Sequence, residues 1–335
     1  MFPMALRSLI AAGLAVLAGT LAPGGARAET IKVGSLKSPT SAGVVAIARE
    51  RGYFAAEGLT VEPVYFETAQ PIAVATVSRS IDVGITGLTA AVYSLAGQGA
   101  LKIVAGYTRE VPSFRLTSYV VSNRAYAAGL TSFKDFPGHS VAVPVLGSPP
   151  HYSLALLAEK IGFDLKTMRI LQLQSNANQV SAVSGGQADI GLIQATAVMP
   201  AIERHDVRLL GWVGDETPWQ LGAVFVLTKT ADERSDMVKR FLRAYGKAGT
   251  DFDDAFAGPD GRRKDGPTAD ATLALIAQAI GQPVELVRLG LGLVDARLDE
   301  KDVLHQIDWY RSQGLLKGEV DGNAVIDKRY VVPLP

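Results

Sequence analysis

Short apolar runs alternate with amphipathic stretches along most of the chain. The runs at 31–36, 59–66 and 83–85 are rich in β-formers and predict strands. Between them, apolar residues at helical spacing over 44–48 and 72–77 predict helices. Because strands and helices alternate, the pattern predicts a parallel sheet whose strands are connected by helices.

The same strand, helix and strand arrangement occurs a second time. Residues 74–78 (VATVS) are followed by 82–85 (DVGI), and residues 180–184 (VSAVS) are followed by 189–192 (DIGL). A β-rich run precedes each copy. This internal similarity predicts two related α/β lobes.

Two isolated apolar strands flank the second copy, at 119–121 and 223–227, and the chain after them is predicted to be helical to its end. We interpret them as hinge strands that pass between the lobes. The fold class is therefore α/β, with two lobes joined by two hinge strands and a ligand cleft between them. The predicted division is a signal peptide over 1–28, lobe I over 29–120 with 225–335, and lobe II over 121–224.

The first 28 residues have the three parts of a secretory signal: a basic Arg7, an apolar stretch over 9–21, and the small residues Ala26 and Ala28 before the cleavage point. The alternative is a membrane anchor, but an apolar stretch of about 13 residues is shorter than the ~20 that cross a bilayer. We expect cleavage after Ala28 and a periplasmic protein.

Charge and composition exclude several kinds of partner. Lys and Arg together number 33, as do Asp and Glu, so no overall positive charge attracts nucleic acid. The sequence contains no cysteine, which excludes disulfides, thiolate metal sites, thiol nucleophiles and a lipidated N-terminal cysteine. The basic residues 262–264 are most simply a solvated loop, with a basic docking patch as the alternative.

No catalytic set is visible in the sequence. The four histidines are too far apart in sequence to form a helical metal motif. The Gly-His-Ser-Val-Ala run at 138–142 approaches a hydrolase elbow, but Ser140 begins a strand instead of following one. Phosphate-binding and dinucleotide-binding loops are also missing. We expect no catalytic residue, no metal and no cofactor.

Hydroxyl-bearing and small residues follow four predicted strands, where helices begin. In open α/β sheets, ligands bind beyond these strand ends, because helix N-termini present free N–H groups. The alternative is that these residues only cap their helices. The candidate ligand-binding residues at the four junctions are Ser38, Thr40 and Ser41; Thr86, Gly87, Leu88 and Thr89; Gly147, Ser148 and His151; and Gln194 and Thr196.

Several segments resemble one family of transport proteins. They are 48–54 (ARERGYF), 57–61 (EGLTV), 81–87 (IDVGITG), 133–138 (FKDFPG), 147–152, 186–189 and 313–316 (QGLL). These segments are similar to the periplasmic substrate-binding proteins of nitrate, sulfonate and taurine ABC importers, a family that includes binders of thiamine pyrimidine precursors. The resemblance covers nearly the whole chain after residue 28.

The resemblance implies the type II periplasmic-binding architecture and a function without catalysis. The protein would capture a small organic solute by closure of the lobes, and would deliver it to an inner-membrane ABC permease with its cytoplasmic ATPase. We expect a small-molecule ligand, no nucleic acid and a monomer. An enzyme on the same fold that acts on a pyrimidine or aromatic metabolite, and a periplasmic ligand sensor, are the alternatives.

The ligand motifs depart from the family at two places. Sulfonate and taurine binders often have Trp-Asp-Pro where this chain has Gln194-Ala195-Thr196, and Leu88 stands where an acidic or hydroxyl residue is common. The expected solute is therefore either sulfonate-like or aromatic and heterocyclic, and anionic. Trp219 is a candidate to stack on an aromatic ligand, with packing under the hinge as the alternative. His151 is either a ligand contact or solvent-facing.

Overall fold

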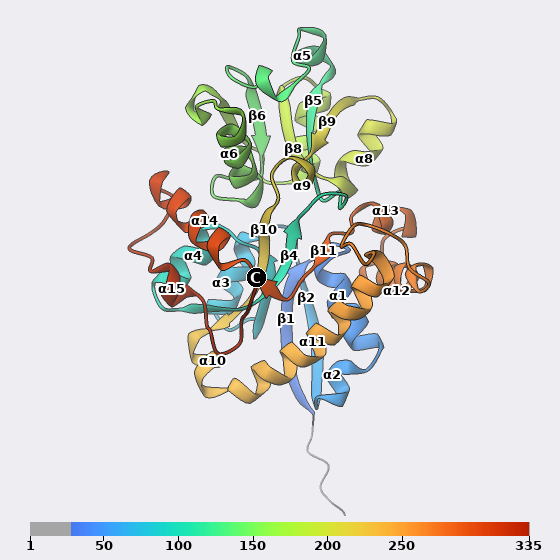
Figure 1. Cartoon of the computed structure of the whole chain (residues 1–335), viewed down its shortest axis with the longest axis vertical. Helices are drawn as coiled ribbons and strands as arrows, with labels where there is room; N and C mark the ends of the chain where they lie inside the picture. Colours follow the sequence, from blue (N-terminus) through green and yellow to red (C-terminus); the bar gives the residue numbers. More distant parts are fainter. Residues whose placement is uncertain (1–27, 335) are drawn as a thin grey trace, which may run out of the picture.

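The computed structural model describes residues 28–334 and consists of two α/β lobes stacked along the long axis of the molecule (Figure 1). The predicted signal peptide lies almost entirely outside these residues. The chain passes between the two sheets twice, in 111–116 and in 213–218. These two segments lie side by side, because Ser113 N–H donates to an Asp215 carboxylate oxygen at 3.0 Å and a Cβ on Gly214 would lie 2.3 Å from the Val111 carbonyl oxygen.

The elements have the following bounds. The strands are β1 Glu29–Leu36, β2 Leu59–Phe66, β3 Val83–Gly87, β4 Leu101–Glu110, β5 Thr117–Ser122, β6 Ser140–Val143, β7 Arg169–Gln172, β8 Ile190–Gln194, β9 Val207–Trp212, β10 Trp219–Leu227, β11 Leu293–Val294, β12 Arg297–Leu298 and β13 Val332–Pro333. The helices are α1 Ser41–Glu50, α2 Tyr53–Ala56, α3 Gln70–Val77, α4 Ala90–Gly97, α5 Asn123–Ala127, α6 Pro149–Ile161, α7 Asn176–Ser184, α8 Ala195–Glu203, α9 Val213–Glu216, α10 Thr228–Glu233, α11 Ser235–Phe256, α12 Ala269–Ile280, α13 Val284–Leu289, α14 Glu300–Ser312 and α15 Gly322–Val325, with short 3₁₀ turns at Phe133–Asp135 and Leu165–Thr167.

The two larger sheets have matching topologies, which confirms the repeat predicted from the sequence. The first sheet has the order β11-β4-β10-β3-β1-β2 and the second has the order β7-β6-β8-β5-β9. In each, three strands are parallel, β2-β1-β3 and β7-β6-β8, and the next strand, β10 or β5, is antiparallel to them.

The Asp-x-Gly motif makes equivalent contacts in both copies of the repeat. Asp82 accepts a hydrogen bond from the Lys32 N–H of β1, and Asp189 accepts one from the Ser140 N–H of β6. Each carboxylate thus satisfies a backbone donor of the neighbouring parallel strand. The glycine allows the preceding helix to pack closely, because a Cβ on Gly191 would lie 2.9 Å from Val183 of α7.

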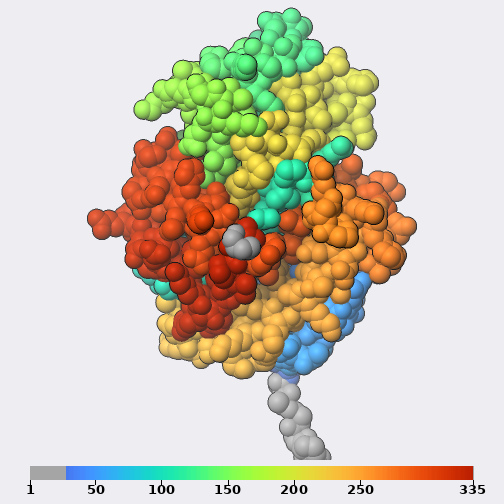
Figure 2. All heavy atoms as spheres, in the orientation of Figure 1, coloured from blue at the N-terminus to red at the C-terminus, as the bar shows by residue number. Residues whose placement is uncertain are grey.

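Buried side chains on both faces of the first sheet connect it to helices. Alternate residues of β10 point to opposite faces, so that Val224 packs with α1, α11 and α12 while Phe225 packs with α3, α4 and α14. The cluster that contains Phe225 also includes residues of α6, in the other lobe. Figure 2 shows the C-terminal residues (red) meeting that lobe (green), where the Tyr152 hydroxyl and His305 Nδ1 are 2.6 Å apart.

The sequence pattern missed some strands. It gave no prediction for β4, which is buried on both faces and lacks the strict alternation of apolar and polar residues that marks a half-buried strand. The end of the chain is not wholly helical, because β11 pairs with β4 and β12 pairs with β13. The predicted lobe boundaries at 120/121 and 224/225 stay a prediction, and we propose that the crossings in 111–116 and 213–218 mark them.

Candidate functional site

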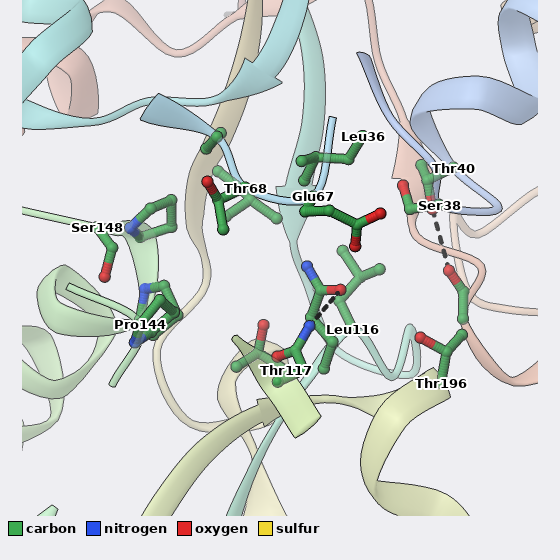
Figure 3. Close-up of a pocket in the computed structure, with 18 of the residues that line it drawn as sticks. Leu36, Ser38, Thr40, Glu67, Thr68, Leu116, Thr117, Pro144, Ser148 and Thr196 are labelled. Atoms are coloured by element: carbon green, nitrogen blue, oxygen red, sulfur yellow. Dashed lines mark hydrogen bonds between the residues drawn. The ribbon is translucent and has the colours of Figure 1, made fainter. Parts of the chain in front are cut away.

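A partly open cavity of about 420 Å³ lies between the two lobes, at the ends of their parallel strands (Figure 3). Leu36 is the last residue of β1 and lines the cavity on one side, while Pro144, which follows β6, lines it on the other. Thr117, at the start of β5, and Leu221 of β10 lie near the two crossings and also line the cavity. Both lobes therefore contribute to one cavity, as the strand-end argument predicted.

The N-terminal ends of six helices converge on this cavity. The N-cap residue of each of α1, α3, α4, α6, α7 and α8 lines it, and every one of these helices has at least eight residues. Six positive dipole ends therefore face the same space, but not all six helices offer free N–H donors. Helix α6 begins with Pro149 and Pro150, which have no N–H, and the first N–H groups of α4 and α8 donate to the carbonyls of Gly147 and Leu116. The six N-cap residues are Thr40, Ala69, Thr89, Ser148, Ser175 and Gln194.

Some of these side chains also cap their helices. The Thr89 hydroxyl accepts a hydrogen bond from Val92 N–H at 3.2 Å, and the Ser175 hydroxyl accepts one from Asn178 N–H at 3.2 Å. The Ser148 hydroxyl instead donates to the Val145 carbonyl at 2.7 Å, so its own lone pairs remain available. Capping and lining the cavity are therefore not exclusive alternatives, and Thr89 does both.

The candidate residues separate into two groups. Seven line the cavity: Ser38, Thr40, Gly87, Thr89, Ser148, Gln194 and Thr196. Six do not: Ser41, Thr86, Leu88, Gly147, His151 and Trp219. Ligand contact by the first group stays a prediction, while the second group is placed by the packing described next.

Three first-lobe candidates face away from the cavity. The Ser41 hydroxyl donates to the Leu36 carbonyl at 2.9 Å, within the β1–α1 turn. Thr86 is fully buried, and its hydroxyl has no partner within the described residues. The expected apolar contact from Leu88 is wrong, because this side chain is fully buried in the core that α4 shares with α14.

The two aromatic candidates belong to a cluster between α6 and α14. The Trp219 ring lies 4.9 Å from that of Tyr152, which matches the packing alternative and leaves no face for a ligand. His151 is also buried, 5.0 Å from Trp309, and its Nδ1 accepts a hydrogen bond from Gly147 N–H at 3.2 Å. Burial lowers the pKa of His151 to about 4, so the ring stays neutral at neutral pH. Its role is to shape the loop that starts α6.

Sequence reasoning missed several residues that line the cavity. Glu67 and Thr68 come from the β2–α3 connection; Gln174 comes from the equivalent β7–α7 connection, and Asn176 is the first residue of α7. The repeat itself was the signal for these four, because both copies contain a strand end before the matching helix. The site residues predicted from the sequence follow the first and third strands of each copy, and none of them follows the second.

A buried carboxyl group lies beside the cavity, at the end of β4. Glu110 is fully buried, pairs in register with Trp219, and has no hydrogen-bond partner for either carboxyl oxygen within residues 28–334. Burial raises the pKa of Glu110 to about 8, an effect that Thr117 reduces and Asp215 increases. Because Thr117 lines the cavity, the Glu110 carboxyl group, which is mainly protonated at neutral pH, lies next to a residue of the cavity wall.

Contacts on two sides of the cavity connect the lobes. The Ala90 N–H of α4 donates to the Gly147 carbonyl of the second lobe at 3.0 Å. On the other side, a Cβ on Gly290 would lie 2.3 Å from Thr196 Cγ2, so only glycine permits this approach. The Thr40 hydroxyl fixes the same segment by donating to the Gly290 carbonyl at 3.1 Å.

The described part of the chain contains no group of three or more His, Asp or Glu residues arranged to hold a metal ion. Within residues 28–334, no helix is both long and apolar enough to cross a membrane. The cavity lining itself contains no lysine, arginine or histidine, and Glu67 is its only carboxylate. Its affinity for a ligand must come from helix ends, hydroxyls, amides, apolar contacts and this one negative charge.

Two lobes of matching topology, joined by two crossings and closed over a cavity, define the fold of the periplasmic binding proteins. The periplasmic aliphatic sulphonate binding protein SsuA from Escherichia coli has this fold, with a TM-score of 0.71 and 17% identity over 90% of this chain and 98% of that one. The alkanesulfonate-binding protein SsuA from Xanthomonas axonopodis pv. citri, bound to MOPS, gives 0.70 and 19% over 90% and 99%. The fold class expected from the sequence is confirmed.

A family model described as NMT1/THI5 like matches residues 38–261, which is more than half of the chain. The chain therefore belongs to the NMT1/THI5-like family, and the resemblance seen in the sequence is confirmed. A search of curated proteins finds no match. The desulfurization enzyme DSZB also shares the fold, with a TM-score of 0.61 and 14% identity over 91% of this chain and 96% of that one, so the fold alone does not decide between binding and catalysis.

Proposed function

We propose that this protein is the periplasmic solute-binding component of an ABC importer. It would be exported by a signal peptide cleaved after Ala28, act as a monomer, and deliver its solute to an inner-membrane permease with a cytoplasmic ATPase. The observation that carries the proposal is the cavity, which residues of both lobes line and toward which six helix N-termini point. Closure around a ligand between two lobes needs no catalytic residue.

The cavity favours a small organic solute with both polar and apolar parts. Its apolar wall includes Leu36, Leu116, Pro144 and Leu221, while hydroxyl and amide groups surround the helix ends. A sulfonate, a carboxylate or a polar heterocycle presents acceptor atoms that the helix N–H groups bind well. A volume of about 420 Å³ lies within the range of ordinary small-molecule sites.

A thermal-shift screen tests the proposal. The panel contains sulfonates, aromatic carboxylates, pyrimidines and nitrate, each with and without an amino group where such pairs exist. A ligand present at ~100 times its dissociation constant adds ~2.7 kcal/mol of stability. We expect at least one solute to raise the melting temperature and to be recovered chemically unchanged. Failure of every small solute to bind the folded protein would contradict a solute-binding function.

The second candidate is an enzyme on the same fold, favoured by the similarity to DSZB. Its test uses the same experiment. If mass spectrometry shows that the stabilising solute is converted during incubation with the protein, catalysis replaces transport as the function.

A further inference from the structure

The cavity contains one charged side chain, and that charge is negative. Glu67 extends from the β2–α3 connection, and Figure 3 shows its carboxylate pointing into the cavity near Ser38 and Thr40. The carboxylate makes no ion pair or hydrogen bond with any residue in the described part of the chain. Glu67 is therefore an acceptor that a ligand is free to use.

The rest of the lining makes this charge decisive. None of the residues that line the cavity is a lysine, an arginine or a histidine, so no side chain of the lining carries a positive charge that offsets the carboxylate. A purely anionic ligand bound in this space lies close to a like charge, which is unfavourable. A protonated nitrogen beside Glu67 forms a charge-assisted hydrogen bond instead.

The six helix N-termini favour the opposite chemistry. Their positive dipole ends attract acceptor atoms, and the Asn176 and Ala177 N–H groups of α7 have no partner within the described residues. The hydroxyls of Ser148 and Thr196 on the second-lobe wall are compatible with such atoms. A ligand that satisfies both parts of the site has an acceptor or oxyanion group at one end and a nitrogen donor at the other.

We propose that the solute carries a protonated or strongly donating nitrogen that binds Glu67, together with an oxyanion or other acceptor group bound by the helix N-termini. The natural ligand is then a zwitterion or an amine-bearing polar molecule, and not the simple anion expected from the sequence. Glu67 is the residue that determines this specificity. The inference rests on the proposed solute-binding function.

Matched pairs of probes test it. They are 3-aminopropanesulfonate with propanesulfonate, 4-(aminomethyl)benzoate with 4-methylbenzoate, and 3-aminopropanoate with propanoate. Affinity is measured by calorimetry on the full mature chain. In at least one pair, we expect the amine to bind at least tenfold more tightly than its nitrogen-free partner. Glu67→Gln should reduce that preference to less than threefold.

A control separates ligand recognition from stability. Glu62→Gln removes an exposed carboxylate from β2, outside the cavity lining, and should leave the preference unchanged. If Glu67 only stabilised the start of α3, Glu67→Gln would lower the melting temperature of the ligand-free protein and leave the preference intact, which would overturn the inference. Binding of nitrogen-free anions alone would also overturn it while leaving solute binding established. Absence of binding by any solute in the wider screen would instead count against the proposed function and this inference together.

Discussion

Glu110 provides a test of the structure that needs no ligand. Its carboxyl group is fully buried without a hydrogen-bond partner in residues 28–334, and burial raises its pKa from 4.5 to about 8. Between these two values the folded protein holds a proton that the unfolded chain releases, so stability falls as the pH rises. One pKa unit corresponds to 1.36 kcal/mol. Between pH 5 and pH 8, this single group therefore removes about 4 kcal/mol of folding free energy.

Glu110→Gln removes the ionisable proton and keeps the size of the side chain. We expect the wild type to lose about 4 kcal/mol more than the variant when the pH is raised from 5 to 8, measured by urea denaturation followed by circular dichroism. Asp253, whose pKa burial raises to about 7, titrates in both proteins and cancels in the comparison. The exposed variant Glu62→Gln serves as control and should follow the wild type. Parallel stability curves for the wild type and Glu110→Gln would refute the burial of an ionisable carboxyl group at this position.

Two further predictions concern closure and export. Gly290→Ala places a Cβ 2.3 Å from Thr196 Cγ2 across the cleft, so calorimetry should show at least a tenfold loss of affinity for the best solute of the screen. Adding Thr196→Ser, which removes that methyl group, should restore the affinity. An unchanged affinity in Gly290→Ala would mean that this contact is not part of the closed state. The exported protein should begin at Glu29, the first residue of β1, whose carboxylate pairs with Arg234 and Arg240. Intact-mass analysis of a periplasmic extract checks this, and a full-length protein in the membrane fraction would contradict it.

The repeat was predictable because its residues have local physical reasons. Asp82 and Asp189 each satisfy the N–H of a neighbouring parallel strand, and Gly84 and Gly191 each allow a helix to pack closely on the sheet. Because the Asp and Gly residues that make these contacts are close together in each copy, the same short motif occurs twice and can be recognised from the sequence alone. The strand order of each lobe then follows from the connections between strands and helices.

The parts that were missed depend on contacts distant in sequence. Nothing near His151 indicates that Trp309 of α14, about 160 residues later, packs on its ring. Nothing near Trp219 indicates that its ring packs on Tyr152 of α6. Leu88 follows a strand end like Thr89, but packing against α14 turns it into the core. Glu67 is not among the predicted site residues because a glutamate after a strand is usually only a solvated residue. Its side chain is exposed in the structure as well, and its place in the cavity lining becomes apparent only when both lobes are present.

The account depends most on the claim that both lobes bind one solute in one cavity. Calorimetry on Thr68→Val, from the first lobe, and Thr196→Val, from the second, tests it with the best solute of the screen, because each change removes a hydroxyl with little change of shape. Loss of one hydrogen bond costs ~0.5–1.5 kcal/mol, so each variant should bind that solute about two- to tenfold more weakly. Thr60→Val, on the exposed side of β2, should bind as the wild type does. If the substitution in only one lobe weakens binding, or if neither does, the shared site between the lobes is wrong.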